Sequence, residues 1–187
     1  MGFDMVARIE NETDLAGMRS AGKKAAAVLN MIGPHVQPGV TTDYLNQLCH
    51  EYIVNELHCV PAPLNYGGGG GQEPFPKSIC TSVNHVVCHG IPSPNKKLKN
   101  GDVMNIDITV IDNGYYGDSS KMFFAGEPSV LAKRLSKVTQ DCLYRGIDVV
   151  RPGAQLGDIG HAIQSYAEAQ RFTVVREFCG HGIGKDF

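Results

Sequence analysis

The chain has 187 residues, of which 42% are hydrophobic and 19% are charged, and its formal net charge is −2. This length is enough for one domain with a buried core, and the composition is that of an ordinary soluble globular protein. The weak negative charge gives no electrostatic basis for binding nucleic acid, and no apolar run in the sequence is long enough to span a membrane.

The first ten residues and the cysteines indicate where the protein works. The sequence MGFDMVARIE has no apolar segment behind basic residues, which argues against a signal peptide. The cysteines form no CxxC pair and lie in apolar segments, so we expect reduced, buried thiols in a cytoplasmic protein. They are Cys49, Cys59, Cys80, Cys88, Cys142 and Cys179.

The spacing of apolar residues predicts a helix over residues 13–32. We expect Thr13 to cap this helix, and the Gly-Pro pair at 33–34 to end it. A second amphipathic helix is predicted over residues 43–57, because the same spacing recurs behind the cap candidates at 41–42, both threonines.

A long loop is predicted next, over residues 61–76. It contains five consecutive glycines at 67–71, and such a run is flexible because glycine loses the most backbone entropy on ordering. Two short strands are expected after the loop, over residues 78–82 and 85–89, with a turn at Asn84 between them.

A β-hairpin is predicted over residues 103–120, where β-rich segments flank an Asn-Gly turn signal at 113–114. With a two-residue loop, Thr109 faces Asp118 across the strands, and alternation puts Asp107 on the same face. The two carboxylates are then diagonal neighbours, with Cα atoms about 7–8 Å apart, which suits two ligands of one cation. A three-residue loop would separate them, and two unrelated surface aspartates are the alternative interpretation.

The pattern of two helices starts again after residue 128. Helices are predicted over residues 130–149 and 156–170, and Val-Arg-Pro-Gly before the later one repeats the Val-Gln-Pro-Gly before residue 40. A shift of about 114 residues superposes the helix faces, which indicates an internal duplication whose second hairpin would begin near position ~217, after this sequence ends. The candidate buried positions of the first repeated helix are Leu131, Leu135, Val138, Cys142 and Ile147.

Two histidine motifs supply further site candidates. The strings Cys-His-Gly-Ile-Pro and Gly-His-Gly-Ile-Gly place His89 and His181 beside glycine, which leaves room for the close approach of a ligand. Neutral imidazole with two carboxylates is a common mixed ligand set for Zn, Mn, Co or Fe. His181 is therefore a candidate partner of Asp107 and Asp118, whereas the motif by itself favours an ordinary strand-end histidine for His89.

Four longer strings carry a family resemblance: NYGGGGGQEPFPKSICTSVNHVVCHGIP, LKNGDVMNIDITVIDNGYYGDSSKMF, VVRPGAQLGDIG and FTVVREFCGHGIGKDF. They resemble the bacterial type I methionine aminopeptidases, and the resemblance covers nearly the whole chain. It implies an α+β fold of the pita-bread kind, with two pseudo-symmetric helix–sheet halves. We therefore expect one catalytic domain over residues 1–187, with a first repeat at about 10–124 and a second, incomplete repeat from about 125 onward.

The resemblance also implies roles for single residues. Two divalent metal ions (Co, Mn, Fe or Zn) would be held by Asp107, Asp118 and His181 together with two glutamates. Both glutamates, and a second substrate-contacting histidine, would follow residue 187. His89 matches the histidine that contacts the substrate near the scissile peptide.

The methionine pocket of the family implies substrate-binding roles for Pro63, Tyr66, Phe75 and Phe187. Residues 67–74 lengthen the loop between Tyr66 and Phe75 relative to the family's short form, which predicts a longer and looser pocket rim. Phe75 and Phe187 are equally explained as ordinary core aromatics.

The implied activity is metal-dependent removal of the N-terminal methionine from peptides and nascent proteins, with a small second residue preferred. We expect a cytoplasmic monomer that works near the ribosome. Three alternatives stay open: a proline-directed aminopeptidase, a non-catalytic pita-bread protein that binds peptides, and an inactive chain in which three of five ligands bind metal weakly. The proline-directed enzymes usually carry an extra N-terminal domain, for which residues 1–12 are too short.

Overall fold

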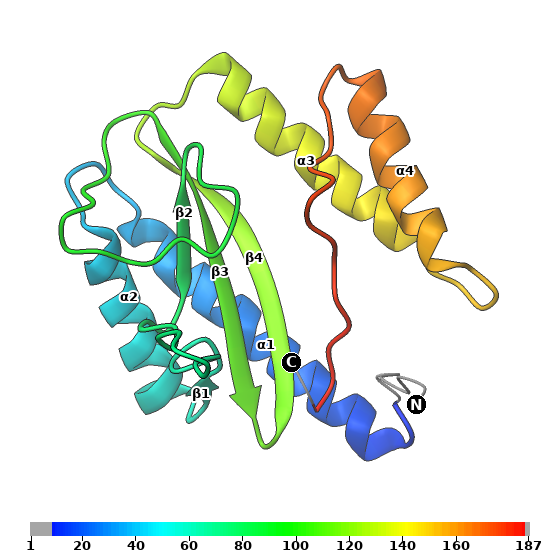
Figure 1. Cartoon of the computed structure of the whole chain (residues 1–187), viewed down its shortest axis with the longest axis horizontal. Coiled ribbons are helices and arrows are strands. Elements are labelled where there is room, and N and C mark those ends of the chain that lie inside the picture. Colours follow the sequence, from blue (N-terminus) through cyan, green and yellow to red (C-terminus); the bar gives the residue numbers. More distant parts are fainter. Residues whose placement is uncertain (1–8, 186–187) are drawn as a thin grey trace. The chain divides into compact units, whose positions relative to one another are not determined.

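The computed structural model describes residues 9–185, which form two compact units (Figure 1). The first unit comprises Met1–Glu127 and His181–Phe187, and the second comprises Pro128–Gly180. The chain therefore leaves the first unit after the predicted hairpin and returns to it at His181, one of the predicted site residues.

The first unit is built on an antiparallel sheet whose central strand is β3. Strand β3 (Asp102–Asp112) pairs with β1 (Val60–Pro61), β2 (Cys80–Val83) and β4 (Tyr115–Ala125). The helices of this unit are α1 (Glu12–Ile32) and α2 (Thr42–Glu51), followed by the short helical turns η1 (Gly33–His35) and η2 (Tyr52–Glu56).

Both helices predicted in this unit are confirmed, with one change of cap. The prediction that Thr13 caps α1 is wrong, because the side chain of Asn11 accepts the hydrogen bond from the Asp14 backbone N–H, 2.9 Å away. Thr41 caps α2 as expected, since its hydroxyl accepts a hydrogen bond from the backbone N–H of Tyr44.

The expected strand over residues 85–89 is wrong, whereas the strand before it is confirmed as β2. Asn84 turns the chain with a positive φ of 56°, and the residues after it do not join the sheet ladder. Two backbone hydrogen bonds tie the following segment to β2, from Thr81 N–H to the Gly90 carbonyl at 2.7 Å and from Val86 N–H to the Val83 carbonyl at 3.2 Å. Residues 85–89 therefore form an irregular segment beside β2.

The two faces of β3 have different environments. Met104, Ile106, Ile108 and Val110 on one face are 0% exposed and pack in the core with the apolar sides of α1 and α2. Figure 1 shows α1 running behind β3 and β4. The approach is close at Gly117 of β4, where an added Cβ would lie 2.2 Å from the backbone of α1. The other face of β3 is only partly buried, and it carries the predicted site.

The second unit contains the two repeated helices, α3 (Val130–Asp148) and α4 (Leu156–Ala169). Val138 and Cys142 are buried as predicted, against the α4 side of the unit. The predicted burial of three α3 residues is wrong, because within this unit only one face of α3 is covered. Those residues, with their exposed fractions, are Leu131 (63%), Leu135 (47%) and Ile147 (55%).

The six cysteines are all free, but two of them are not buried as expected. Cys88 is half-buried, and Cys179 is exposed because it lies in the irregular segment after α4. Among residues 9–185, no helix combines the length and the apolar character needed to cross a membrane.

Candidate metal centre

The hairpin has the register that the sequence predicts. Asn113 and Gly114 have φ angles of 50° and 85°, the left-handed conformations that a tight two-residue hairpin turn requires. Thr109 is therefore opposite Asp118, and Asp107 is opposite Ser120. Because directly opposed residues share a face, Asp107 and Asp118 lie as diagonal neighbours on one side of the sheet.

Asp107 and Asp118, called the acid pair below, lie in surroundings that disfavour the ionised form of Asp107. Burial raises the pKa of Asp107 to about 6, and the negative charge of Asp118 and a hydrogen bond with it act in the same direction. The nearby His181 acts in the opposite direction. Two carboxylates this close favour either a shared proton or a bound cation between them.

His181 reaches Asp118 from the returning end of the chain. Its Nε2 lies 3.3 Å from Oδ2 of Asp118, and its Nδ1 lies 2.9 Å from the carbonyl oxygen of Gly182. A carbonyl only accepts hydrogen bonds, so Nδ1 carries the proton, and Nε2 of the neutral ring presents a lone pair to the carboxylate. Such a contact needs either a proton between the two atoms or a cation that both atoms bind.

The same spacing fits two ligands of one metal ion. Ligands bound about 2.0–2.2 Å from an ion at tetrahedral or octahedral angles are roughly 3.0–3.5 Å apart, a range that includes the distance between the histidine and aspartate atoms. A backbone carbonyl on the second ring nitrogen is also the usual outer partner of a metal-binding histidine. The donor types and spacing therefore fit a divalent cation at Asp118 and His181, with Asp107 beside them.

Asp107, Asp118 and His181 do not by themselves form a complete metal-binding site. Within residues 9–185, no group of three or more His, Cys, Asp or Glu side chains is arranged to hold a metal ion. Asp107 and Asp118 interact as one pair, and Asp118 and His181 as another. A stable centre thus needs further ligands.

Cys80 is a neighbour of the acid pair that the sequence reasoning missed. It lies opposite Asp107 in the pairing of β2 with β3. Burial raises the pKa of its thiol to about 12, and the charges of Asp107, Cys88 and Asp118 add to the effect. In the metal-free protein the thiol of Cys80 is therefore neutral at neutral pH, and it forms part of the wall beside the two aspartates. The strand pairing was the information that could have revealed it.

His89 lies in the irregular segment beside β2. His89 is exposed, and its backbone φ of 54° lies in the left-handed region. Most residues with a Cβ adopt this region only at some energetic cost. The following Gly90 fits tightly, because an added Cβ would lie 2.2 Å from the carbonyl oxygen of Thr81. This close contact holds the backbone that presents His89.

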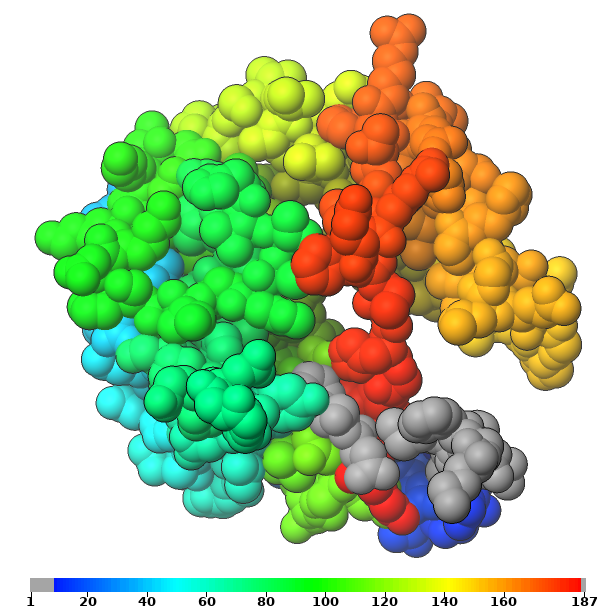
Figure 2. Space-filling view, viewed as in Figure 1, coloured from blue at the N-terminus to red at the C-terminus, as the bar shows by residue number. Residues whose placement is uncertain are grey.

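The predicted pocket residues are brought together by backbone hydrogen bonds. The Tyr66 N–H donates to the Pro63 carbonyl at 3.0 Å, and the Phe75 N–H donates to the Tyr66 carbonyl at 2.9 Å. Residues 67–74 therefore form a closed surface loop that leaves Tyr66 and Phe75 adjacent, and the loop lies on the face of the molecule shown in Figure 2. The fourth predicted pocket residue, Phe187, lies outside the described residues.

The segment that carries the predicted pocket residues is joined to β3 next to the two aspartates. Ala62 N–H donates to the carbonyl of Thr109 at 3.0 Å, and Thr109 is the residue opposite Asp118. Pro63, which follows Ala62, is buried, Phe75 is half-buried, and Tyr66 is 55% exposed. The pocket candidates and the metal candidates thus meet at the same stretch of the central strand.

The sequence is similar to one family of metallopeptidases and to proteins of known name within it. Residues 16–187 match the model of metallopeptidase family M24. The methionine aminopeptidase of Rickettsia prowazekii is 56% identical to the chain over 183 residues, which cover 98% of the chain and 68% of that relative. The chain belongs to the M24 metallopeptidases, among the bacterial methionine aminopeptidases. The methionine aminopeptidase of Escherichia coli K12 is 51% identical, and the chain covers 67% of its length.

Solved structures of methionine aminopeptidases share the fold. The enzyme from Rickettsia prowazekii superposes with a TM-score of 0.91, over 97% of this chain and 70% of that one. The enzyme from Thermotoga maritima, 34% identical, gives a TM-score of 0.89 over the same shares. The α+β pita-bread fold expected from the resemblance is therefore confirmed. An Xaa-Pro dipeptidase from Bacillus anthracis, 19% identical with a TM-score of 0.78, shares the fold alone.

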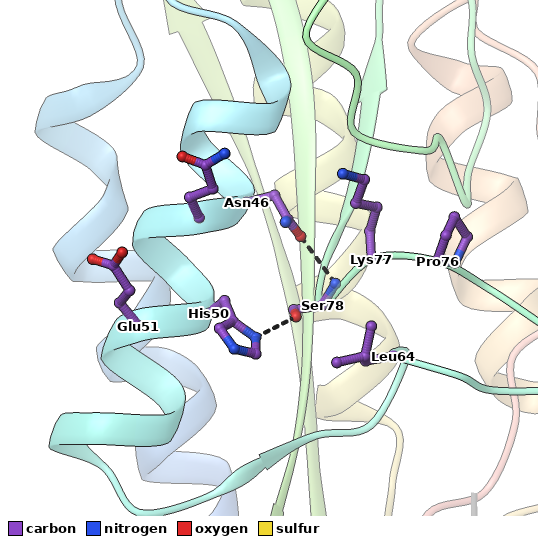
Figure 3. A pocket seen from close by; sticks show the side chains of 8 residues that line it. Asn46, His50, Glu51, Leu64, Pro76, Lys77 and Ser78 are labelled. Carbon is purple, nitrogen blue, oxygen red and sulfur yellow. Dashed lines mark hydrogen bonds between the residues drawn. The ribbon is translucent and has the colours of Figure 1, made fainter.

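A separate hollow of about 230 Å³ lies between α2 and residues 76–78 (Figure 3). At its wall, Ser78 Oγ lies 2.7 Å from Nδ1 of His50, and Ser78 N–H donates to the Asn46 side chain at 2.9 Å. Ser78 is 2% exposed, so these bonds hold the start of β2 against α2 and leave the hydroxyl inaccessible. Leu64 and Pro76 also line the hollow, whereas none of the predicted pocket residues does.

Proposed function

We propose that the described site belongs to a metal-dependent exopeptidase that removes methionine from the N-termini of peptides and nascent proteins. The observation that supports this most directly is that Asp118 lies beside both Asp107 and His181 in a chain that is similar to methionine aminopeptidases over nearly its whole length. Each of the three is an oxygen or nitrogen donor, as divalent transition metals require.

Two divalent ions (Co, Mn, Fe or Zn) are the proposed cofactors. Asp107, Asp118 and His181 would hold them together with two glutamates that the family resemblance puts after residue 187. When bound, such ions supply Lewis acidity, which lowers the pKa of water and polarises a carbonyl group. The chain covers about two thirds of its relatives, so the complete activity is a proposal for the whole protein.

The remaining roles belong to side chains of this chain. His89 donates a hydrogen bond to the substrate near the scissile peptide, where negative charge develops on the carbonyl oxygen. Pro63, Tyr66, Phe75 and Phe187 line a narrow apolar pocket for the methionine side chain, whose flexible thioether adapts to such spaces. A small second residue is preferred where the pocket wall crowds that position.

The place and partners of the reaction follow from the same proposal. The substrates are the free N-termini of newly made proteins, near the ribosome, and the protein works as a monomer. Six free cysteines fit a cytoplasmic location, because disulfides form mainly in oxidising compartments. The net charge of −2 offers no electrostatic attraction to nucleic acid.

Metal binding and peptide cleavage test the proposal separately. The chain is titrated with Mn²⁺ or Co²⁺ by calorimetry and is then incubated with a Met-Ala-Ser peptide while free methionine is measured. Metal binding is expected to disappear in Asp118→Asn, whereas Ser119→Ala, an exposed neighbour on the opposite face, is expected to bind as the wild type does. Equal metal binding by the Asp118 variant and the wild type would refute the site.

A second candidate is a non-catalytic pita-bread protein that binds peptides. The observation that favours it is that no complete group of three metal-binding side chains is found among residues 9–185. A chain that binds a Met-Ala-Ser peptide but releases no methionine with either metal, also when extended to the length of its relatives, would support this candidate.

A further inference from the structure

A buried carboxylate at the start of α1 joins three segments of the first unit. Asp14 is 4% exposed, and its Oδ1 accepts a hydrogen bond from the Tyr115 hydroxyl at 2.8 Å. The same oxygen lies 2.7 Å from Nζ of Lys185, and Oδ2 accepts from the Glu10 N–H at 3.1 Å. The Lys185 ammonium and the Tyr115 hydroxyl hold the pKa of Asp14 below its usual value, so the carboxylate is charged at neutral pH.

Lys185 lies at the end of the short segment that carries His181. The Lys185 ammonium is 5.2 Å from the centre of the Tyr115 ring, and Gly184 accepts a hydrogen bond from Tyr116 N–H at 2.9 Å. Figure 1 shows this chain end beside the turn of the hairpin and the first turns of α1. His181 makes a further contact of the segment, with Asp118 on the same strand. The segment therefore follows the first residues of β4 and is attached at both of its ends.

The sequence of the segment makes it flexible by itself. The string Gly-His-Gly-Ile-Gly places glycines on both sides of His181, and each glycine loses more backbone entropy on ordering than other residues. The His181 side chain is 57% exposed, so burial contributes little to its position. A charge pair with a buried carboxylate is a stronger anchor, because Asp14 without Lys185 would leave an incompletely paired charge in the interior.

We propose that Lys185, through its ion pair with Asp14, is a positioning residue that holds the 181–185 segment on β4 and so places the His181 imidazole beside Asp118. This inference rests on the proposed metal site and adds to it a residue that does not touch the metal. Preorganising a ligand in this way raises metal affinity, because less entropy is lost when the ion binds.

The chain offers a matched control for this ion pair. Lys24 of α1 lies 2.8 Å from the carboxylate of Asp112, which is also almost fully buried, but its bond fixes α1 to the end of β3. Lys24→Met and Lys185→Met therefore each leave one buried aspartate without its lysine. Only the second substitution removes an anchor of the His181 segment.

The test measures Mn²⁺ and Co²⁺ affinity by calorimetry and amide hydrogen exchange of residues 182–185 in the 187-residue chain. Lys185→Met is expected to weaken metal binding by roughly tenfold or more and to speed the exchange, as loss of an outer partner does in other metal sites. Lys185→Arg is expected to restore both, since it keeps the charge. Lys24→Met is expected to change neither, although it lowers the melting temperature.

Each other outcome contradicts the inference. Unchanged metal affinity in Lys185→Met, or an equal loss in Lys24→Met, would show that the ion pair acts only on general stability. If the wild-type chain binds neither metal, the titration is repeated on a chain extended to the length of its relatives, and failure of that chain to bind refutes the proposed function. In that case, hydrogen exchange alone still decides whether Lys185 holds the segment, and unchanged exchange in Lys185→Met overturns the anchor itself.

Discussion

Replacing Asp107 by asparagine in the metal-free protein should make the fold more stable at neutral pH. The pKa of Asp107 is raised from 3.8 to about 6, mainly by burial and then by the charge of Asp118. A raised pKa means that the folded state binds a proton more tightly than the unfolded state between these two values. The contribution of Asp107 is thus most favourable below pH 4 and is lost as the pH rises through 6.

The size of the effect follows from the shift. About two pKa units correspond to roughly 3 kcal/mol for a fully buried group. Because Asp107 is partly exposed and interacts with Asp118, we expect a smaller difference in the free energy of unfolding, on the order of 1–2 kcal/mol at pH 8. Asp107→Asn removes the charge and recovers this amount at pH 8. Near pH 4 the wild-type carboxyl is mostly neutral, and the two proteins should differ little.

Urea unfolding in the presence of a chelator, at pH 4, 6 and 8, measures the difference. Glu73→Gln, a change of an exposed loop carboxylate, is the control and should show the same small difference at every pH. Adding Mn²⁺ at pH 8 should reverse the order, because the ion stabilises only the protein that binds it. An asparagine variant that is no more stable than wild type at pH 8, or whose advantage is as large at pH 4, would refute the interpretation of the acid pair.

Four further predictions concern the fold and the pocket. Gly117→Ala should destabilise by about 1–3 kcal/mol in urea unfolding, because the new Cβ would lie 2.2 Å from the α1 backbone, whereas Gly22→Ala on the open side of α1 should stabilise by about 0.5–1 kcal/mol. Ser129→Ala should lower the stability of α3 by about 1 kcal/mol, seen as faster hydrogen exchange, since the hydroxyl caps that helix. In an active preparation of the protein, His89→Ala should lower kcat with little change in metal content, and a large loss of metal would make it a ligand instead. Shortening residues 67–71 should change KM for a Met-Ala-Ser peptide with metal content unchanged.

The site was predictable where short-range chemistry decides the geometry. The Asn-Gly turn sets the loop length, the loop length sets the register, and the register alone puts Asp107 and Asp118 on one face. Residues 85–89 show the limit of this reasoning, because their valines suit a strand but these residues pair with no strand of the described sheet. The pair of Asp14 and Lys185 was not predictable, since no spacing rule connects two residues from opposite ends of the chain.

The repeat shows why a shared pattern does not guarantee a shared environment. A shift of about 114 residues takes Gly17 of α1 to Leu131 of α3, and Ala21 to Leu135. At the α1 positions β4 comes close, since a Cβ at Gly17 would lie 2.4 Å from the Tyr115 ring and Ala21 is 0% exposed. The α3 positions carry leucines that are 63% and 47% exposed. Over glycine or alanine, a strand can lie close to the helix backbone, whereas a leucine side chain occupies that space. No strand could therefore approach α3 as closely as β4 approaches α1 unless these leucine side chains moved. The spacing of apolar residues is thus similar in the two helices, but the size of the residues at these positions determines how close a strand can lie to each helix.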